Sequence, residues 1–270
     1  MTRPPAIVRA RRGDVHRAAA LIATAFHGLD VAAWLVPDPL ERQRVLYANF
    51  RIFVDHAVDH GDMFVTEDRC AVAVWFPRDR PLPEISDYER RRWLACGPYT
   101  DRFEALDAAF DKHHPTAAHR HLAFLAVHPD HQGYGIGTAM LDRYHHRLDR
   151  AGLPAYLEAS SPASRDLYLR HGYTDHGTPI DLPHGGPRLW PMWRTPRNLD
   201  APSPSIVEKR RQQTVEVVRR YTTGGESIRA IAEHVGISYG LVHKLLVESG
   251  TSLRARGAPR RWGLAEAGHT

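Results

Sequence analysis

The sequence contains little cysteine: Cys70 and Cys96 are the only two in 270 residues. Two thiols fit a reducing cytoplasm, and we do not expect them to form a disulfide. No apolar run approaches the roughly 20 residues that span a bilayer. Residues 1–5 lack the apolar core of a signal peptide. We therefore expect a cytoplasmic protein without a membrane partner.

The first 200 residues lack net charge, because they contain 25 basic and 25 acidic side chains. Residues 201–270 carry 11 Lys and Arg against 6 Asp and Glu, which accounts for the whole net charge of +5. A basic segment attached to a neutral one is typical of nucleic-acid binding. The alternative is a basic tail that only increases solubility.

Composition also predicts where the chain divides. A length of 270 residues fits two domains, and 43% hydrophobic residues support an ordinary core. The stretch 198–205 is rich in Pro and Ser and is typical of a linker. We expect a first domain at 1–197, a helical domain at 206–257 and a flexible basic tail at 258–270. No internal repeat is visible.

Hydrophobic periodicity predicts alternating strands and helices in the first domain. The expected strands are 7–11, 63–66, 70–76, 121–127, 155–159, 178–182 and 188–193. The expected helices are 14–27, 39–60, part of 82–116, 136–151 and 162–171, followed in the second domain by 206–222, 228–235 and 239–248.

A glycine-rich turn lies between an apolar strand and an amphipathic helix. Gly133, Gly135 and Gly137 occupy alternate positions there. Without side chains, backbone N–H groups can close on a phosphate at the helix N-terminus, where the helix dipole favours negative charge. The alternative is a tight bend without a ligand. The spacing fits a dinucleotide-binding turn poorly, and the absence of a following Gly-Lys-Ser/Thr excludes a Walker loop.

Three segments in this region resemble the GCN5-related N-acetyltransferases (GNAT) in order and spacing: 125–137, 151–160 and 167–173. The resemblance covers about residues 5–196 and is closest to the puromycin N-acetyltransferases. It implies an α/β (α+β) fold with a mixed central sheet and flanking helices. A small all-α helix-turn-helix domain would follow.

The resemblance implies acetyl-CoA as cofactor, with direct transfer to an amine while both substrates are bound. Backbone groups of the fourth strand would hold the pantetheine, and the glycine turn would hold the pyrophosphate. The expected cofactor-binding residues are Leu125, Ala126, Val127, Gln132, Gly133, Tyr134, Gly135, Ile136, Gly137, Thr138 and Ser164. Ser164 stands where puromycin N-acetyltransferases have asparagine, so we expect a weaker contact there.

Three residues are candidates for catalysis. Tyr168 matches the family tyrosine beside the cofactor sulfur, where a phenol can protonate the departing thiolate. A base must also remove a proton from the amine, and Glu158 or His121 could supply it. Each candidate could instead be structural. We expect no metal site.

The amine itself is not defined by the sequence. A small-molecule primary amine is expected, and an aromatic pocket would suit an aminonucleoside antibiotic or an arylamine. The candidate lining residues are Phe26, Trp34, Phe50, Tyr99 and Trp190, each of which is more typical of a core.

The basic segment resembles bacterial helix-turn-helix modules. Counted from Ile228, Ala232 is fifth, Gly236 ninth and Val242 fifteenth, which gives a small residue, a turn glycine and a branched core residue. The expected DNA contacts are Ser238, Tyr239, His243, Lys244, Arg254 and Arg256, the arginines in a mobile arm. Specific binding would need a dimer.

Three functions remain open from the sequence. The first is acetylation of a small amine by an enzyme fused to a DNA-binding module. The second is a transcriptional regulator whose acetyltransferase fold only senses acetyl-CoA or an amine. The third is a protein lysine acetyltransferase brought to DNA-bound partners.

Overall fold

The computed structural model describes residues 5–197 and 204–254, and it divides the chain into two compact units, Met1–Leu199 and Asp200–Thr270. The helices of the first unit are α1 (Val15–Phe26), α2 (Asp30–Leu35), α3 (Pro39–His60), α4 (Tyr88–Cys96), α5 (Thr100–His113), α6 (Ile136–Ala151) and α7 (Pro162–Arg170). Its strands are β1 (Ile7–Arg9), β2 (Asp62–Thr66), β3 (Ala71–Pro77), β4 (Arg120–Val127), β5 (Ala155–Ala159), β6 (Thr174–Asp175), β7 (Ile180–Asp181) and β8 (Arg188–Arg194). Short 3-10 turns lie at Arg12–Asp14, Gly97–Tyr99 and Pro129–His131.

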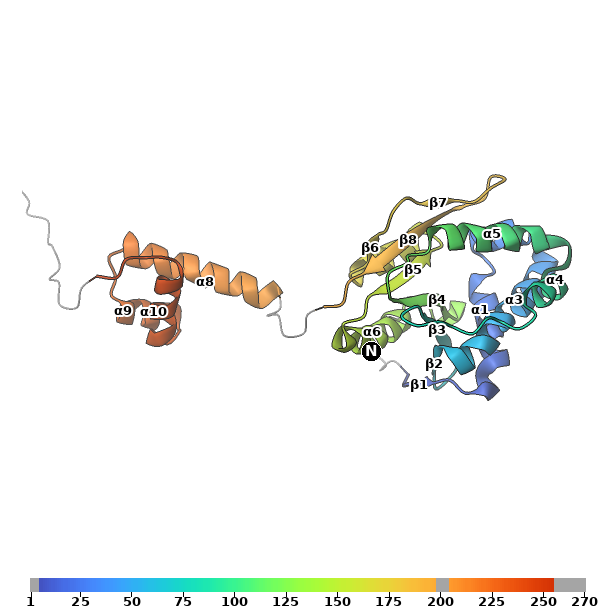
Figure 1. Cartoon of the computed structure of the whole chain (residues 1–270). Coiled ribbons are helices and arrows are strands. Elements are labelled where there is room, and N and C mark those ends of the chain that lie inside the picture. The colour runs from blue at the N-terminus through green and yellow to red at the C-terminus, as the bar shows by residue number, and fades with distance from the viewer. Residues whose placement is uncertain (1–4, 198–203, 255–270) are drawn as a thin grey trace, which may run out of the picture. The chain divides into compact units, whose positions relative to one another are not determined.

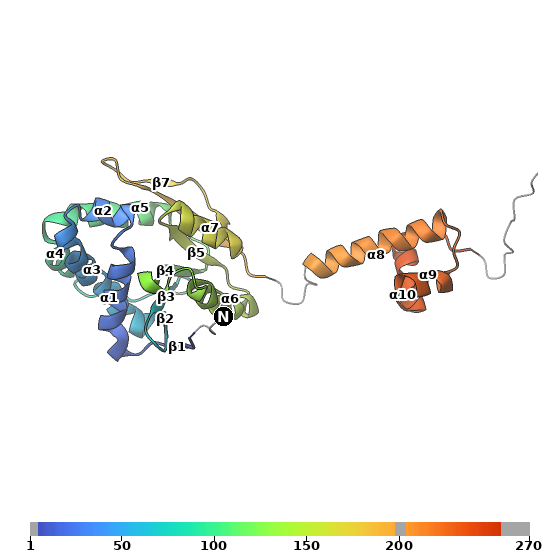
Figure 2. The ribbon, with the colours of Figure 1, turned by 180° about the vertical axis from the view of Figure 1, so that it is seen from behind.

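The strands form one mixed sheet in the order β1-β2-β3-β4-β5-β8-β6, with β7 pairing to β8. The pairs are antiparallel except for β4 and β5, which run parallel. Helices flank this sheet, with α1 and α3 on one side of β3 and β4 and α6 on the other (Figures 1 and 2). The mixed sheet with flanking helices confirms the fold class predicted from the sequence.

Side-chain alternation along β3 explains the two layers of core. Every residue of β3 is buried. Val72, Val74 and Phe76 pack with α1 and α3, whereas Ala73 and Trp75 pack with α6. Because successive side chains of a strand point to opposite faces, an apolar run without polar positions predicts a strand covered on both faces.

A β-bulge interrupts the pairing of β3 with β4. Val74 pairs with Phe124 and Trp75 with Leu122, so Ala123 is the extra residue. Ala123 and Phe124 consequently both pack on the α1 face, while Leu122 and Leu125 pack on the α6 face. A bulge bends its strand and increases the local twist, which turns the second half of β4 away from the line of its first half.

The parallel pairing of β4 with β5 is short. Only Arg120 with Ala155 and His121 with Tyr156 pair, and the remaining residues of the two strands have no ladder partner in each other. β5 instead pairs over its whole length with β8. The sheet is therefore continuous between β4 and β5 at the start of β4, and from Leu122 onward the two strands part.

A buried ion pair ties the end of α6 to β8. Arg194 and Asp149 side chains are 2% and 7% exposed, with Arg194 Nη1 2.8 Å from Asp149 Oδ1. Arg194 Nη2 also donates to Asp149 Oδ2 at 2.8 Å. His145, one turn earlier on α6, shares a hydrogen bond of 3.0 Å with the Tyr173 hydroxyl. Burial, and then the charge of Arg194, lower the pKa of His145 to about 3 from 6.5.

The second unit is an independent three-helix assembly. It contains α8 (Pro204–Thr222), α9 (Ile228–Val235) and α10 (Tyr239–Glu248) around a core of its own: Val217, Tyr221, Ile231, Val242, Leu245 and Leu246. Ser227 and Ser238 cap α9 and α10 by accepting from Ala230 N and Leu241 N. Gly236 follows α9 with φ +70°, which glycine adopts without strain.

The sequence patterns located most of these elements. Helices 39–60, 136–151, 228–235 and 239–248 and strand 155–159 have the predicted bounds. The six-residue helix α2 and the two-residue strand β6 were not predicted, and the expected strand 178–182 is only Ile180–Asp181. Among the described residues, no helix is long and apolar enough to cross a bilayer.

His145 makes the stability of the first unit depend on pH. Its imidazole stays neutral in the fold down to about pH 3 but binds a proton below about 6.5 in the unfolded chain. The contribution of neutral His145 to the free energy of unfolding is therefore complete above pH 6.5. It decreases as pH falls, by about 1.4 kcal/mol per pH unit. We expect His145→Gln to remove this slope, measured by urea unfolding between pH 4 and 7.

His146→Gln is the matched control, because His146 is the exposed neighbour on the same helix. It should retain the wild-type slope. An equal slope in His145→Gln and wild type would show that His145 does not cause the pH dependence.

Candidate functional site

The N-terminus of α6 presents backbone N–H groups that its own helix does not use. Gly133 and Gly135 adopt φ +81° and +77°, and Gly135 is the N-cap residue without a side-chain cap. The first helical bond of α6 runs from Ala139 N to Gly135 O, at 3.0 Å. The preceding amides of the first turn have no intrahelical acceptor, and together with the helix dipole they favour an anion.

The expected cofactor residues of β4 and the glycine turn lie together. The Gln132 side chain folds back on β4 and donates to Val127 O at 3.0 Å, so this carbonyl already has a donor. A Cβ on Gly137 would lie 3.8 Å from Val127 and 3.9 Å from Leu125, so the helix packs closely against the strand. Tyr134 is exposed, whereas Ile136 is buried and anchors the turn.

His121 and Glu158 form a pair across the start of the parting between β4 and β5. His121 Nε2 lies 2.9 Å from Glu158 Oε2, and the side chains are 12% and 5% exposed. Burial opposes ionisation of Glu158, but the charge and hydrogen bond of His121, and then His114, lower the pKa of its carboxyl below 4.5. The sequence offered these residues as alternative bases, and the structure joins them.

This pairing fixes the state of the imidazole. A carboxylate only accepts, so His121 Nε2 carries the hydrogen that it shares with Glu158. The other nitrogen, Nδ1, is buried and has no hydrogen-bond partner among the described residues. In a neutral imidazole that nitrogen is the basic one, which is the arrangement by which a carboxylate orients a histidine base.

Three neighbouring residues escaped the sequence analysis. His114 follows α5, and its ring lies 4.9 Å from that of His121 and 5.0 Å from that of Tyr156. His119 Nε2 lies 3.2 Å from His114 Nε2, and His119 Nδ1 donates to Ala117 O at 2.7 Å. The His-x-His spacing of 119 and 121 around the start of β4 is a usable signal, but nothing local marks His114.

Tyr168 lies on the opposite face of the sheet from this pair. It packs in the α6-side core, with its ring 5.6 Å from that of Tyr173. Leu157 and Ala159 of β5 belong to the same core, so Glu158 between them points to the other face. Burial raises the pKa of the Tyr168 hydroxyl, which keeps it protonated.

The hydroxyl of Ser164, expected to contact the cofactor, bonds within the start of its own helix. Its hydroxyl accepts from Ser161 N at 3.0 Å and from Ser161 Oγ at 3.1 Å, and it donates to Ser161 O at 2.9 Å. These contacts use the single hydrogen and both lone pairs of a serine hydroxyl. The Ser164 hydroxyl is therefore engaged in the capping box of α7, so a contact with the cofactor would have to replace one of these hydrogen bonds.

The aromatic candidates separate into two groups. Phe26 and Phe50 form an edge-to-face pair at 5.6 Å, and Phe124 of the bulged strand lies 5.1 Å from Phe50. Trp34 is buried like Phe50, and its indole N–H donates to Pro183 O at 3.1 Å. Tyr99 is half-buried beside the α1-side core, and Trp190 beside the α6-side core.

In the second unit, α10 exposes part of the predicted DNA-contacting set. Tyr239 is 49% exposed, and His243 is exposed. The Lys244 ammonium is also exposed and lies 3.8 Å from Glu248 one turn later. Ser238 is the N-cap of α10, and its side chain accepts a hydrogen bond from Leu241 N. It therefore stabilises the start of the helix, and it is also exposed there.

Arg254 is not part of a mobile arm, contrary to expectation. Its guanidinium lies over the Tyr221 ring at 4.2 Å and donates to Gly225 O at 2.8 Å and to Tyr221 O. Its backbone N–H also donates to the Tyr221 hydroxyl. Arg254 therefore closes the three-helix core. Arg256 lies outside the described residues.

Comparisons with known proteins agree with this geometry. Residues 103–175 match the family model of an acetyltransferase (GNAT) domain, and residues 206–261 match that of a helix-turn-helix domain. A histone acetyltransferase HPA2 and related acetyltransferase from Corynebacterium glutamicum is 23% identical with a TM-score of 0.52, covering 74% of this chain and 100% of that one.

Two further solved structures are more distant. The mosquito arylalkylamine N-acetyltransferase like 5b is 14% identical with a TM-score of 0.48, covering 70% of this chain and 100% of its own. The ribosomal-protein-S18-alanine N-acetyltransferase of Escherichia coli is 16% identical with a TM-score of 0.42, covering 73% and 99%.

The first unit thus defines an acyltransferase domain built on a mixed α/β sheet. Its residues 103–175 match an acetyltransferase (GNAT) domain, and a match to a helix-turn-helix domain follows it in the chain.

Gly135 offers a test of the anion site at α6. Gly135→Ala forces an L side chain into positive φ and places a methyl group at the uncapped helix start. No protein atom lies within 4 Å of the added Cβ, so the fold accommodates it. We expect the Kd for CoA to rise by at least about 10-fold, which is about 1.4 kcal/mol, in isothermal titration calorimetry.

Gly152→Ala is the matched control. Gly152 caps the other end of α6 with φ +64° and equally open surroundings. The two variants share the backbone strain, so an equal Kd for both would place CoA elsewhere.

Proposed function

We propose that this protein transfers an acetyl group from acetyl-CoA to the primary amine of a small molecule, by direct transfer with both substrates bound. The observation that carries the proposal is the parting of β4 from β5. It is bordered by the donor-rich start of α6 and Tyr168 on one side and by the His121–Glu158 pair on the other.

The residues present fit acetyl-CoA. The uncapped amides of α6 suit its pyrophosphate, and the two positive-φ glycines leave the approach free of side chains. Beyond His121 the backbone of β4 has no ladder partner in β5, which suits the amide groups of a pantetheine arm. When bound, this cofactor supplies the activated acetyl thioester.

The protein's own residues handle the protons. An aliphatic amine is mostly protonated at neutral pH and must lose a proton to become a nucleophile. The His121–Glu158 pair accepts that proton at the imidazole nitrogen that faces no partner, and the carboxylate stabilises the imidazolium that results. Tyr168, protonated and on the other face, donates to the departing thiolate.

The same surroundings support a small aromatic amine as acceptor, of the aminonucleoside or arylamine class. The partly buried aromatic rings of Phe26 and Phe124 lie on the Glu158 face, together with Phe50. Aromatic rings bind flat apolar bodies, while the ionised carboxylate attracts the attached ammonium group. A protein lysine acetyltransferase or a sensor without turnover remains an outcome of the assay.

The helix-turn-helix unit supports DNA binding as a second part of the proposal. Exposed Tyr239, His243 and Lys244 share α10, and the sequence beyond 200 carries the whole excess of positive charge. A helix that presents such side chains suits the major groove of DNA.

Glu158→Gln tests the proposed acetyl transfer. The purified chain is assayed for CoA release with a panel of amines led by puromycin and arylalkylamines. We expect kcat/KM for the amine to fall by about 10²–10⁴, because an amide cannot stabilise the imidazolium. Glu67→Gln is the control, since Glu67 is an exposed carboxylate remote from the pair in sequence.

Tyr168→Phe separates acid catalysis from binding. It should lower kcat by about 10²-fold and leave the Kd for CoA unchanged. Absence of turnover on every amine, with acetyl-CoA still bound, would favour the sensing function. Full turnover in Glu158→Gln would remove this carboxylate from the mechanism.

Lys244→Ala tests the DNA-binding surface. Loss of one phosphate contact should reduce the slope of log K against log salt by about 1, measured by fluorescence anisotropy with a random-sequence duplex. Arg219→Ala is the charge-matched control, because Arg219 lies on α8 and pairs with Glu216 at 2.8 Å. Equal slopes in the two variants would refute a specific role for α10.

A further inference from the structure

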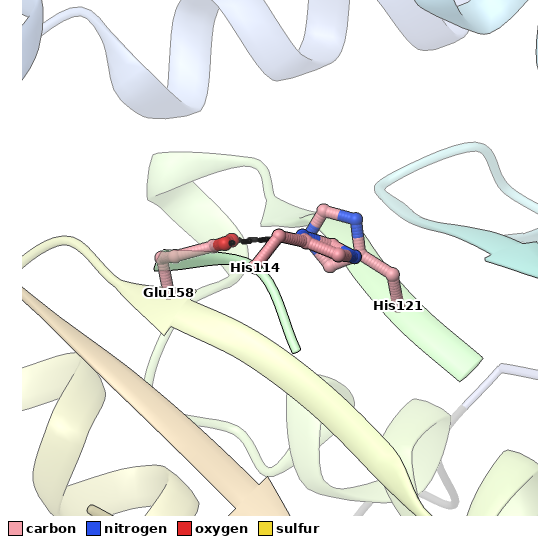
Figure 3. Close-up of side chains that lie close together, drawn as sticks. All are labelled: His114, His121 and Glu158. Carbon is pink, nitrogen blue, oxygen red and sulfur yellow. Dashed lines mark hydrogen bonds and ion pairs between the residues drawn. The ribbon is translucent and has the colours of Figure 1, made fainter. Parts of the chain in front are cut away.

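The cluster of His114, His121 and Glu158 has a composition that acetyl transfer alone does not require. The side chains come from the end of α5, from β4 and from β5, and they point toward one another (Figure 3). One possible ligand atom from each lies within 4.8 Å of the others. Two imidazoles and one carboxylate are a common protein ligand set for zinc.

Inside this cluster, one strong acceptor lacks a partner. Glu158 Oε1 is buried without a hydrogen bond, on a side chain that is 5% exposed. His114 Nδ1 faces it at 3.9 Å, which is too long for a hydrogen bond. The Tyr156 hydroxyl beside Glu158 is also buried without a hydrogen bond of good geometry, and burial and then the charge of Glu158 raise its pKa. A buried carboxylate oxygen without a donor is costly, so either this hydroxyl or a bound cation would compensate it.

The spacing also suits a transition metal. Zn–N and Zn–O bonds are about 2.0–2.2 Å, so two ligands at a tetrahedral angle lie about 3.3–3.5 Å apart. His121 Nε2 lies 2.9 Å from Glu158 Oε2 and His114 Nδ1 lies 3.9 Å from the other oxygen, Oε1, and these distances bracket that value. A bound ion would take the place of the hydrogen on His121 Nε2, and the imidazole would then carry its hydrogen on Nδ1.

A second layer of hydrogen bonds directs His114 toward the cluster. His119 Nδ1–H donates to Ala117 O at 2.7 Å, which leaves His119 Nε2 as an acceptor. His114 Nε2–H then donates to it at 3.2 Å, and His114 Nδ1 is the free nitrogen. Ligand histidines are typically oriented in this way through their other ring nitrogen.

We propose that His114, His121 and Glu158 bind one divalent transition-metal ion of the zinc class, and that the bound ion inhibits acetyl transfer. Three protein ligands leave a fourth position for water. Inhibition follows because the ion occupies the carboxylate and imidazole that would take the proton from the amine. That part rests on the proposed function, whereas the binding itself does not.

A second group, Asp142, His145 and His171, also brings ligand atoms within 4.8 Å. Its atoms are already engaged: His171 with Asp142 at 3.2 Å and with Thr138, and His145 with Tyr173. No buried acceptor of this group lacks a partner. We therefore do not propose it as a metal site. The experiment must still distinguish metal binding at this group from binding at His114, His121 and Glu158.

The experiment titrates the full chain with CoCl2 and follows the visible absorption of tetrahedral Co2+. One ion per chain should bind, and ZnCl2 should displace it. His114→Gln should weaken binding by at least about 100-fold, more than the 10–100-fold typical of losing a second-layer partner. Asp142→Asn, in the competing group, and His146→Gln, an exposed histidine, should bind as wild type.

Turnover is measured in parallel, each variant against its own rate in EDTA. Zn2+ should inhibit turnover of the wild type, and EDTA should restore it. In His114→Gln the zinc concentration that inhibits turnover should rise by the same factor as the Kd for the metal. Wild-type Co2+ binding in His114→Gln, or loss of binding in Asp142→Asn, would overturn the site.

The two proposals fail differently. Zinc-insensitive turnover in a chain that binds Co2+ through His114 would overturn the inhibition. Co2+ binding through His114 without turnover on any amine would support the metal site and count against the enzymatic function.

Discussion

The parallel contact between β4 and β5 is the constraint on which the candidate site depends. It lasts for two residue pairs, after which β5 follows β8 and β4, bent by the bulge at Ala123, follows β3. Two strands that each keep one full partner can part without unfolding the sheet. Beyond these pairs the backbone of β4 has no ladder partner in β5, and Tyr168 and Glu158 lie on opposite faces of the sheet.

This arrangement explains why charged and polar groups are buried beside the opening. An isolated carboxylate at the position of Glu158 would be expensive to bury. The His121 hydrogen bond and charge compensate only one of its oxygens, and the other faces His114 across a gap. The same incomplete compensation that suits a proton acceptor also suits a metal ion, so catalysis and metal binding would compete for the side chains of His121 and Glu158.

Each of the two units has a hydrophobic core of its own. The first buries two layers around β3, and the second closes three helices on Val217, Ile231 and Val242. In the second unit the guanidinium of Arg254 packs on the Tyr221 ring at the edge of the small core, so a residue expected to contact DNA also contributes to folding. The exposed face of α10 then carries the proposed DNA contacts.

The sequence by itself determined the features that depend on neighbours along the chain. The helix starts, the glycine turn at 133–137, the positive φ of Gly236 and the buried Val242 follow from local periodicity and backbone freedom. Tertiary structure decided which side chains meet. Ser164 binds its own cap, and His114, 44 residues from Glu158 in sequence, arrives beside it only because α5 ends over the parted strands. Local patterns carry no information on such contacts, since the sheet order brings distant segments together.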